Sequence, residues 1–121
     1  MRDMNNQIPM NIHPKELNKI LEDESSEKPF VVDVREDDEI AMASFSFSVL
    51  HLPLSKAENW SEKIKELLPK DQPIVVVCHA GVRSLNFGIW LLDQGINKNV
   101  WNLVGGIDAW SKDVDPSVPR Y

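Results

Sequence analysis

The chain contains one cysteine, Cys78, which lies between a strand-like segment and a helix-like segment. Residues 73–77 are almost wholly β-branched and apolar, which predicts a buried strand, and residues 85–92 have the pattern of a helix. Loop amides and the positive end of a helix dipole favour an anion at such a junction. A thiolate held there is stabilised and is a nucleophile near neutral pH. The sequence therefore predicts nucleophilic chemistry at Cys78.

The loop that follows the strand supplies the surroundings of this nucleophile, and its sequence is Cys78-His79-Ala80-Gly81-Val82-Arg83-Ser84. We expect Arg83 to attract an anionic donor and Gly81 to permit a tight or positive-φ backbone. We expect His79 either to hydrogen-bond a donor oxygen or to face water. Ser84 either caps the helix, which we favour, or hydrogen-bonds the sulfur. Backbone amides from His79 to Ser84, with Ala80 and Val82 among them, are expected to form the anion cradle.

The size of the loop separates two kinds of chemistry. Four residues lie between Cys78 and Arg83, whereas tyrosine-specific and dual-specificity phosphatases use a Cys-x5-Arg loop that wraps a tetrahedral phosphate. A loop one residue shorter contracts the ring of amide donors and suits one added sulfur, a persulfide on Cys78. A phosphatase or an arsenate reductase stays an alternative, although the short loop and the lone thiol count against both.

Composition excludes several other classes of protein. The 121 residues carry a formal net charge of −6 with no basic run, which argues against nucleic acid or an anionic membrane as a partner. One cysteine can form neither an internal disulfide nor a cysteine-pair zinc site, and it leaves no resolving thiol for dithiol chemistry. We therefore expect no metal and no cofactor, and a cytoplasmic, reducing location. Residues 1–7 lack the apolar centre of a secretory signal.

Strands and helices alternate along the chain. Strands are predicted at 8–12, 30–34, 49–54, 74–77 and 100–104, and helices at 14–22, 55–68, 82–94 and from 106. We therefore predict an α/β fold with a central, mainly parallel five-stranded sheet and helices on both faces. Residues 1–8 are expected to be a flexible N-terminus and residues 9–121 one domain. Residues 36–39 are predicted to be a solvated acidic turn, and residues 114–121 an extended tail.

Ligands of such sheets bind at the carboxyl ends of the strands, where the Cys78 loop and Asp33 both fall. We expect Asp33 to accept hydrogen bonds from loop amides or Arg83, and Arg35 to pair with a neighbouring acid, so that both support the site without touching substrate. His13 and His51 have no partners at metal-ligand spacing. The four tryptophans are expected to be core residues: Trp60, Trp90, Trp101 and Trp110.

Three segments in register resemble single-domain rhodanese-like sulfurtransferases: the loop of residues 78–84, Val31-Val32-Asp33-Val34-Arg35-Glu36, and Val100-Trp101-Asn102-Leu103-Val104-Gly105-Gly106-Ile107-Asp108-Ala109-Trp110. The resemblance implies a rhodanese-like α/β fold with a central parallel sheet. It also implies a sulfurtransferase that takes sulfane sulfur from a small donor such as thiosulfate and passes it to a nucleophile, such as a thiol or a sulfur-carrier protein. The family usually has Gly-His-Ile-Pro-Gly-Ala before the next strand, and we read residues 43–54 as lacking its glycines and its histidine. A non-catalytic binding or sulfur-carrier module is the main alternative function.

Overall fold

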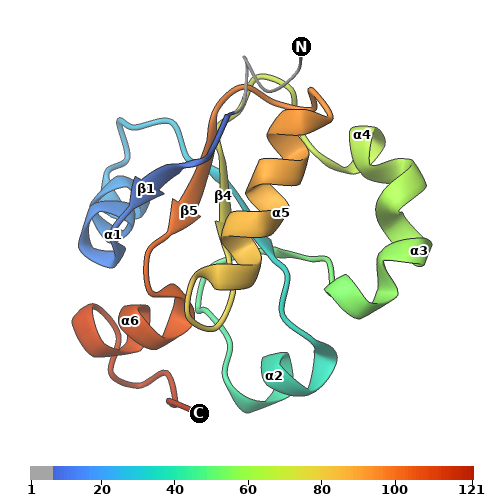
Figure 1. The fold of residues 1–121 in the computed structure, drawn as a ribbon. Coiled ribbons are helices and arrows are strands. Elements are labelled where there is room, and N and C mark those ends of the chain that lie inside the picture. Colours follow the sequence, from blue (N-terminus) through green and yellow to red (C-terminus); the bar gives the residue numbers. More distant parts are fainter. Residues whose placement is uncertain (1–6) are drawn as a thin grey trace.

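The computed structural model describes residues 7–121, and within that range five strands form one sheet (Figure 1). The strands are β1 (Met10–Ile12), β2 (Phe30–Asp33), β3 (Leu50–His51), β4 (Ile74–Val77) and β5 (Val100–Leu103). Their order in space is β1-β5-β4-β2-β3, and each neighbouring pair is parallel. The predicted α/β fold is confirmed. Of the expected flexible segment at residues 1–8, residues 1–6 lie outside the described part.

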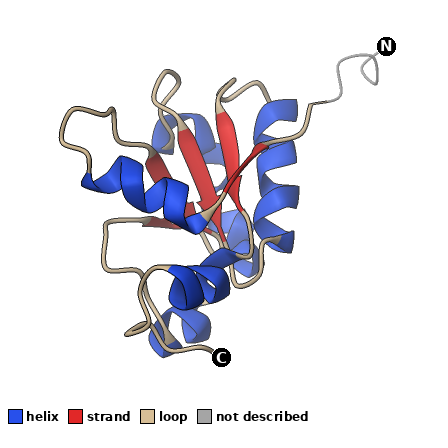
Figure 2. Cartoon of the chain, turned by 90° about the vertical axis from the view of Figure 1, so that its left-hand side faces the viewer, coloured by secondary structure: helices blue, strands red, loops and turns tan. Residues whose placement is uncertain are grey.

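Helices cover both faces of the sheet because alternate strand residues point to opposite sides (Figure 2). On one face, Val31, Val75 and Val77 pack with side chains from α1 (Pro14–Glu22) and α6 (Gly106–Asp113). On the other face, Val32, Ile74 and Val76 pack with α5 (Val82–Asp93), α3 (Ala57–Trp60) and α4 (Ile64–Leu67). All four residues of β4 are buried, as expected for a strand covered on both faces.

The strand register brings three chemically important positions to one edge of the sheet. Asp33 at the end of β2 pairs with Val77, the residue before Cys78. Asn102 on β5 pairs with Val76. The carboxyl ends of β2, β4 and β5 therefore meet where the cysteine loop begins, which is the edge at which parallel sheets bind ligands.

Two predicted elements differ from the structure. The single helix expected over residues 55–68 is divided into η2 (Leu54–Lys56), α3, η3 (Ser61–Lys63) and α4. Ser55 does not cap it, because its amide and hydroxyl both donate to the Glu36 carboxylate. Residues 36–39 are not a turn, since Glu36 is the N-cap of α2 (Asp37–Met42). Acidic residues at the start of a helix are favoured by its dipole, which explains why this run is helical.

Among the described residues, no helix is both long enough and apolar enough to span a bilayer.

Candidate active site

Cys78 is buried, yet its sulfur is surrounded by polar donors. The residue is 1% exposed and belongs to the core that includes Val76 and Phe87. The Gly81 amide donates to Sγ at 3.1 Å and the Ser84 amide at 3.4 Å, and the Ser84 hydroxyl lies at 3.2 Å. These neutral dipoles converge on the position where a thiolate carries its charge.

The geometry of the loop comes from a strand-to-helix turn. Gly81 is the N-cap of α5 and has φ of 100°, in the left-handed region that glycine adopts without strain. Two amides donate to Sγ, fewer than the full set from His79 to Ser84 that the sequence led us to expect. Ala80 and Val82 are exposed, and the Val82 side chain faces solvent.

Ser84 contacts the sulfur rather than capping the helix, which corrects the favoured prediction. It is buried, and its hydroxyl donates to Asn102 Oδ1 at 2.5 Å while contacting Sγ. Asn102 in turn donates from Nδ2 to the Gly81 carbonyl at 3.0 Å. Asn102 therefore ties β5 to the cysteine loop, a role that we did not predict, although an amide within an apolar strand is an unusual residue.

The first turn of α6 also holds the cysteine loop in place through backbone hydrogen bonds. The Cys78 carbonyl accepts from the Ile107 amide at 2.9 Å, and the His79 carbonyl accepts from the Asp108 amide at 3.1 Å. A β-carbon at Gly106 would clash with both of these carbonyl groups. The glycine therefore allows the two backbone segments to approach closely.

Arg83 does not face an open anion site in this structure, because it is paired with Glu39. Its guanidinium donates to both carboxylate oxygens, at 2.6 and 2.8 Å. These hydrogen bonds raise the pKa of Arg83 and, despite partial burial, lower the pKa of Glu39 to about 2. The Arg83 side chain stays 36% exposed, whereas Glu39 is 14% exposed. The expectation that residues 36–39 are simply solvated is therefore wrong for Glu39.

The end of the chain joins the same charged network. The Tyr121 hydroxyl donates to Glu39 at 3.0 Å and accepts from Arg35 at 3.0 Å, and burial raises the pKa of this phenol to about 12. The Tyr121 ring stacks on the His79 ring with centroids 4.2 Å apart. His79 thus contacts an aromatic ring in this structure, and no sequence pattern had linked residue 121 to the site.

Asp33 and Arg35 form a buried ion pair beneath this network. Arg35 Nη2 lies 2.9 Å from Asp33, and both side chains are at most 1% exposed. Burial acts to lower the pKa of Arg35, but hydrogen bonds to Asp33 and Tyr121 raise it overall. Asp33 is bonded to Arg35, not to the cysteine loop or Arg83, which corrects one expectation. Arg35 does pair with a neighbouring acid.

His51 corrects the expectation for residues 43–54. It precedes Leu52 and Pro53, so the chain keeps the His-x-Pro part of the family's segment, with Leu50 and Leu54 at the positions of its two glycines. His51 ends β3 opposite Asp33, and its Nε2 lies 2.6 Å from the Arg35 carbonyl. The histidine therefore links β3 to the residue that carries the buried ion pair. No group of three or more metal-ligating side chains occurs within residues 7–121.

The structure is thus an α/β domain with a buried thiol at a strand-to-helix turn, where backbone amides donate to it at the carboxyl edge of a parallel sheet. The profile of the rhodanese-like domain matches residues 13–113, and this chain belongs to that family. It is 37% identical over 93 residues to the putative sulfurtransferase YtwF of Bacillus subtilis, covering 77% of this chain and 84% of that protein. Transferase and sulfurtransferase are thus the functions named among its relatives.

Two further similarities show how much of a relative this chain covers and which solved structures share its fold. The rhodanese-like/PpiC domain-containing protein 12 of Arabidopsis thaliana, described as chloroplastic, is 38% identical over 111 residues. The match covers 91% of this chain and only 35% of that protein's length. A rhodanese-like domain protein from Staphylococcus aureus has the same fold, with a TM-score of 0.69, 27% identity and coverage of 93% and 98% of the two chains.

Proposed function

We propose that this protein transfers sulfane sulfur from a thiosulfate-like donor to a thiophilic acceptor through a persulfide on Cys78. The observation that carries the proposal is the pair of backbone amides, of Gly81 and Ser84, that donate to Sγ, with the Ser84 hydroxyl in contact with the same atom. A cysteine that only fills a core needs none of these donors, because a thiol is a weak acceptor. A thiolate or a persulfide anion uses both amides.

In the first half-reaction, the Cys78 thiolate attacks the outer sulfur of thiosulfate. The new bond joins Sγ to that sulfur, the S–S bond of the donor breaks, and sulfite leaves with the electron pair. Arg83 attracts the donor by exchanging its Glu39 partner for the donor's oxygens, since it is the charged side chain of this loop that remains partly exposed. The reaction needs neither a metal nor a cofactor.

In the second half-reaction, an acceptor attacks the terminal sulfur of the persulfide, and the Cys78 thiolate is the leaving group. The Gly81 and Ser84 donors stabilise the charge that returns to Sγ. We propose a thiol or a sulfur-carrier protein as the acceptor in the cell, with no role for nucleic acid or a membrane. A lone thiol stays reduced in a reducing compartment, which supports a cytoplasmic location.

Asp33 and Arg35 act in this proposal as positioning residues. Their ion pair is buried, and Arg35 also donates to the Glu39 carbonyl and to the Tyr121 hydroxyl, which in turn donates to the Glu39 carboxylate. These contacts hold Glu39 in place, and Arg83 must separate from Glu39 when the donor binds.

The test is thiocyanate formation from thiosulfate and cyanide, with the kinetic pattern recorded. Two separate half-reactions predict ping-pong kinetics, and Cys78→Ser should lose turnover. Thiocyanate formation by Cys78→Ser at the wild-type rate would overturn the proposal. Ser25→Ala is the control, because this residue is exposed in the turn before β2 and lies outside the cysteine loop.

Two observations favour a second candidate, a non-catalytic module that binds a partner protein or carries sulfur passively. Cys78 is 1% exposed, and Arg83 is already neutralised by Glu39. A module of this kind would give no turnover with thiosulfate across a range of acceptors, even though the protein is folded.

A further inference from the structure

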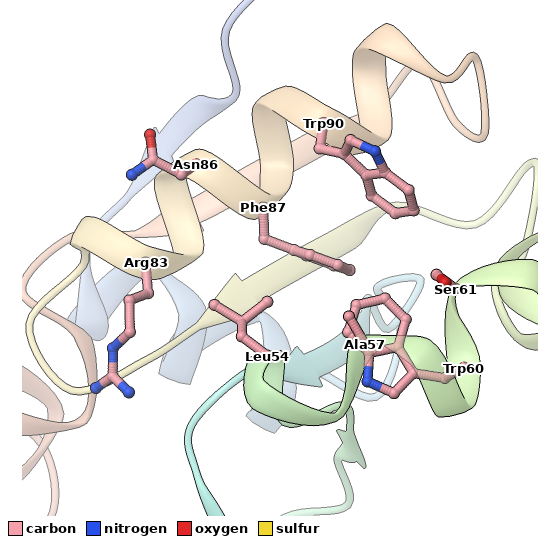
Figure 3. Close-up of a pocket in the computed structure, with 8 residues that line it drawn as sticks. All are labelled: Leu54, Ala57, Trp60, Ser61, Arg83, Asn86, Phe87 and Trp90. Atoms are coloured by element: carbon pink, nitrogen blue, oxygen red, sulfur yellow. The ribbon is translucent and has the colours of Figure 1, made fainter.

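When Arg83 turns from Glu39 to a donor, it leaves a carboxylate behind in a largely buried position. Figure 3 shows Arg83 at one end of an apolar pocket, with its guanidinium directed away from the rings of Phe87 and Trp90. The Arg83 side chain is 36% exposed, so a donor can reach it from solvent, whereas Glu39 is 14% exposed. A buried carboxylate that lacks hydrogen-bond donors is costly. The ease of the exchange therefore depends on the groups that stay bound to Glu39.

Each oxygen of the Glu39 carboxylate accepts one hydrogen bond from Arg83 and one from another group. Oε1 accepts from Arg83 Nη1 at 2.6 Å and from the Glu36 amide at 3.0 Å. Oε2 accepts from Arg83 Nη2 at 2.8 Å and from the Tyr121 hydroxyl at 3.0 Å. When Arg83 leaves, each oxygen therefore keeps one donor, the Glu36 amide on Oε1 and the Tyr121 hydroxyl on Oε2.

The Tyr121 hydroxyl directs its hydrogen to Glu39 because its oxygen accepts from Arg35. Arg35 Nη1 lies 3.0 Å from this oxygen, and the buried ion pair with Asp33 holds the guanidinium in place. A guanidinium only donates, so the hydroxyl hydrogen is left for the carboxylate. Hydrogen bonds in such a chain polarise one another, which makes the hydroxyl a stronger donor. Tyr121 is thus prepared to donate to Glu39 whether or not Arg83 is present.

The C-terminal tail holds Tyr121 in place through contacts that do not involve the carboxylate. Val118 is 5% exposed and packs in the core. Arg120 Nε donates to Asp108 at 2.8 Å. The Tyr121 ring stacks on the His79 ring. Removal of the hydroxyl alone should therefore leave the tail where it is.

We propose that Tyr121 is a positioning residue for donor binding, whose hydroxyl keeps the Glu39 carboxylate hydrogen-bonded when Arg83 turns to the donor. This role rests on the proposed sulfur transfer, and it makes or breaks no covalent bond. The hydroxyl donates to Oε2 before and after the exchange. Its hydrogen bond is stronger afterwards, because the carboxylate charge is no longer neutralised by a guanidinium. Tyr121 therefore stabilises the donor-bound state more than the free state, and it lowers KM for the donor.

The test is Tyr121→Phe, which removes the hydroxyl and keeps the ring that stacks on His79. KM for thiosulfate should rise about threefold to tenfold, in line with one hydrogen bond to a charged group. The value of kcat should change less than about twofold, because the amides that donate to Sγ are untouched. An unchanged or lower KM overturns the inference.

Ser117→Ala is the matched control, because it removes another hydroxyl of the same tail that donates to a carboxylate. Ser117 is exposed, and its hydroxyl donates to Asp115 at 2.5 Å instead of to Glu39. This variant should keep the wild-type KM for thiosulfate. A rise as large as that in Tyr121→Phe would also overturn the inference.

A merely structural role for Tyr121 is tested in the Glu39→Gln background. Without the carboxylate charge, Arg83 has no ion pair to leave, so Tyr121→Phe should change KM less than about twofold there. A displaced tail would instead raise KM equally in both backgrounds, and that result contradicts the inference.

Binding without turnover separates this inference from the proposed function. Cys78→Ser has no thiol to form a persulfide, so its dissociation constant for thiosulfate, measured by calorimetry, reports binding alone. The constant should rise about threefold to tenfold when Tyr121→Phe is added. If binding weakens in this way but the wild type transfers no sulfur, the proposed function fails and the role of Tyr121 stands. If the wild type transfers sulfur but the constant does not change, or thiosulfate does not bind, the inference fails alone. If thiosulfate neither binds nor reacts, both fail.

Discussion

The two sides of the cysteine loop are built from different interactions. On the Cys78 side, the donors to the sulfur are the neutral amides of Gly81 and Ser84, which belong to the loop and its helix. On the Arg83 side, the contacts are between charged groups that come from distant segments, with Glu39 separated from Arg83 by 44 positions. The surroundings of the sulfur are thus set by local backbone conformation. In the proposed mechanism, the charge of Arg83 becomes available to a donor only when the donor displaces Glu39.

Among the changes on the Cys78 side, Gly106→Ala should have the largest effect, because it disrupts the packing of α6 against the cysteine loop. The new β-carbon would clash with the carbonyl groups of Cys78 and His79, at a residue whose φ is 60°. We expect the free energy of unfolding, measured with urea, to fall by about 3 kcal/mol. Gly95→Ala is the matched control, because Gly95 has φ of 68° but no atom within 4 Å of the added carbon. It should lose only about 1 kcal/mol to backbone strain. Equal losses at the two glycines would refute close packing beneath the loop.

Ser84→Ala tests the same side with a smaller change. It removes the hydroxyl at 3.2 Å from Sγ and leaves Asn102 Oδ1 without its donor. We expect kcat/KM for thiosulfate to fall about 10- to 100-fold, because the hydroxyl proton can turn from Asn102 to the charge that develops on Sγ. Ser111→Ala is a control of similar burial, since its hydroxyl donates to the Val118 carbonyl. A rate loss of the same size in that variant would mean that the Ser84 effect is only structural.

On the Arg83 side, Glu39→Gln tests whether the Glu39 carboxylate competes with the donor for Arg83. The change removes the charge that neutralises Arg83 but keeps an oxygen to accept from the Glu36 amide. We expect KM for thiosulfate to fall about fivefold, because a dianion no longer competes with a carboxylate. Asp38→Asn removes the same charge from the exposed side of α2 and should change KM much less. A rise in KM for Glu39→Gln would show that the carboxylate helps to bind the donor.

The acid dependence of stability gives the smallest expected effect. Hydrogen bonds from Arg83 lower the pKa of Glu39 to about 2, from an ordinary value of 4.5. The stability contributed by this pair is therefore fully present above about pH 4.5 and is lost as the pH falls toward about 2. Urea midpoints measured between about pH 5 and pH 2.5 should fall less in Glu39→Gln than in the wild type. Asp38→Asn should follow the wild type, and a parallel fall in all three proteins would remove Glu39 from the acid response.

The sequence predicted the parts of the molecule that depend on local pattern. The apolar run before Cys78 could only be a buried strand, and Gly81 marks the turn into α5. The alternation of strands and helices was enough to predict the parallel sheet. The single helix predicted over residues 55–68 is wrong, since η3 divides the segment and its predicted cap, Ser55, bonds to Glu36 instead. That contact joins residues 19 positions apart, and no local pattern indicates it.

The missed site residues share this dependence on distant contacts. An acidic run such as residues 36–39 is usually solvated, so nothing local marked Glu39 as the partner of Arg83. Tyr121 reaches Glu39 and Arg35 only because the tail folds back toward the loop. The role of Asn102 could have been predicted more easily than those of Glu39 and Tyr121, since a polar amide in a strand with apolar neighbours is unusual.

The central claim is that Cys78 holds one transferable sulfur, and intact-mass spectrometry tests it directly. After treatment with thiosulfate and removal of the excess, the wild type should gain the mass of one sulfur atom. Cyanide should then remove it, and Cys78→Ser should gain nothing. A wild-type mass that does not change, or an equal gain in Cys78→Ser, would contradict the account.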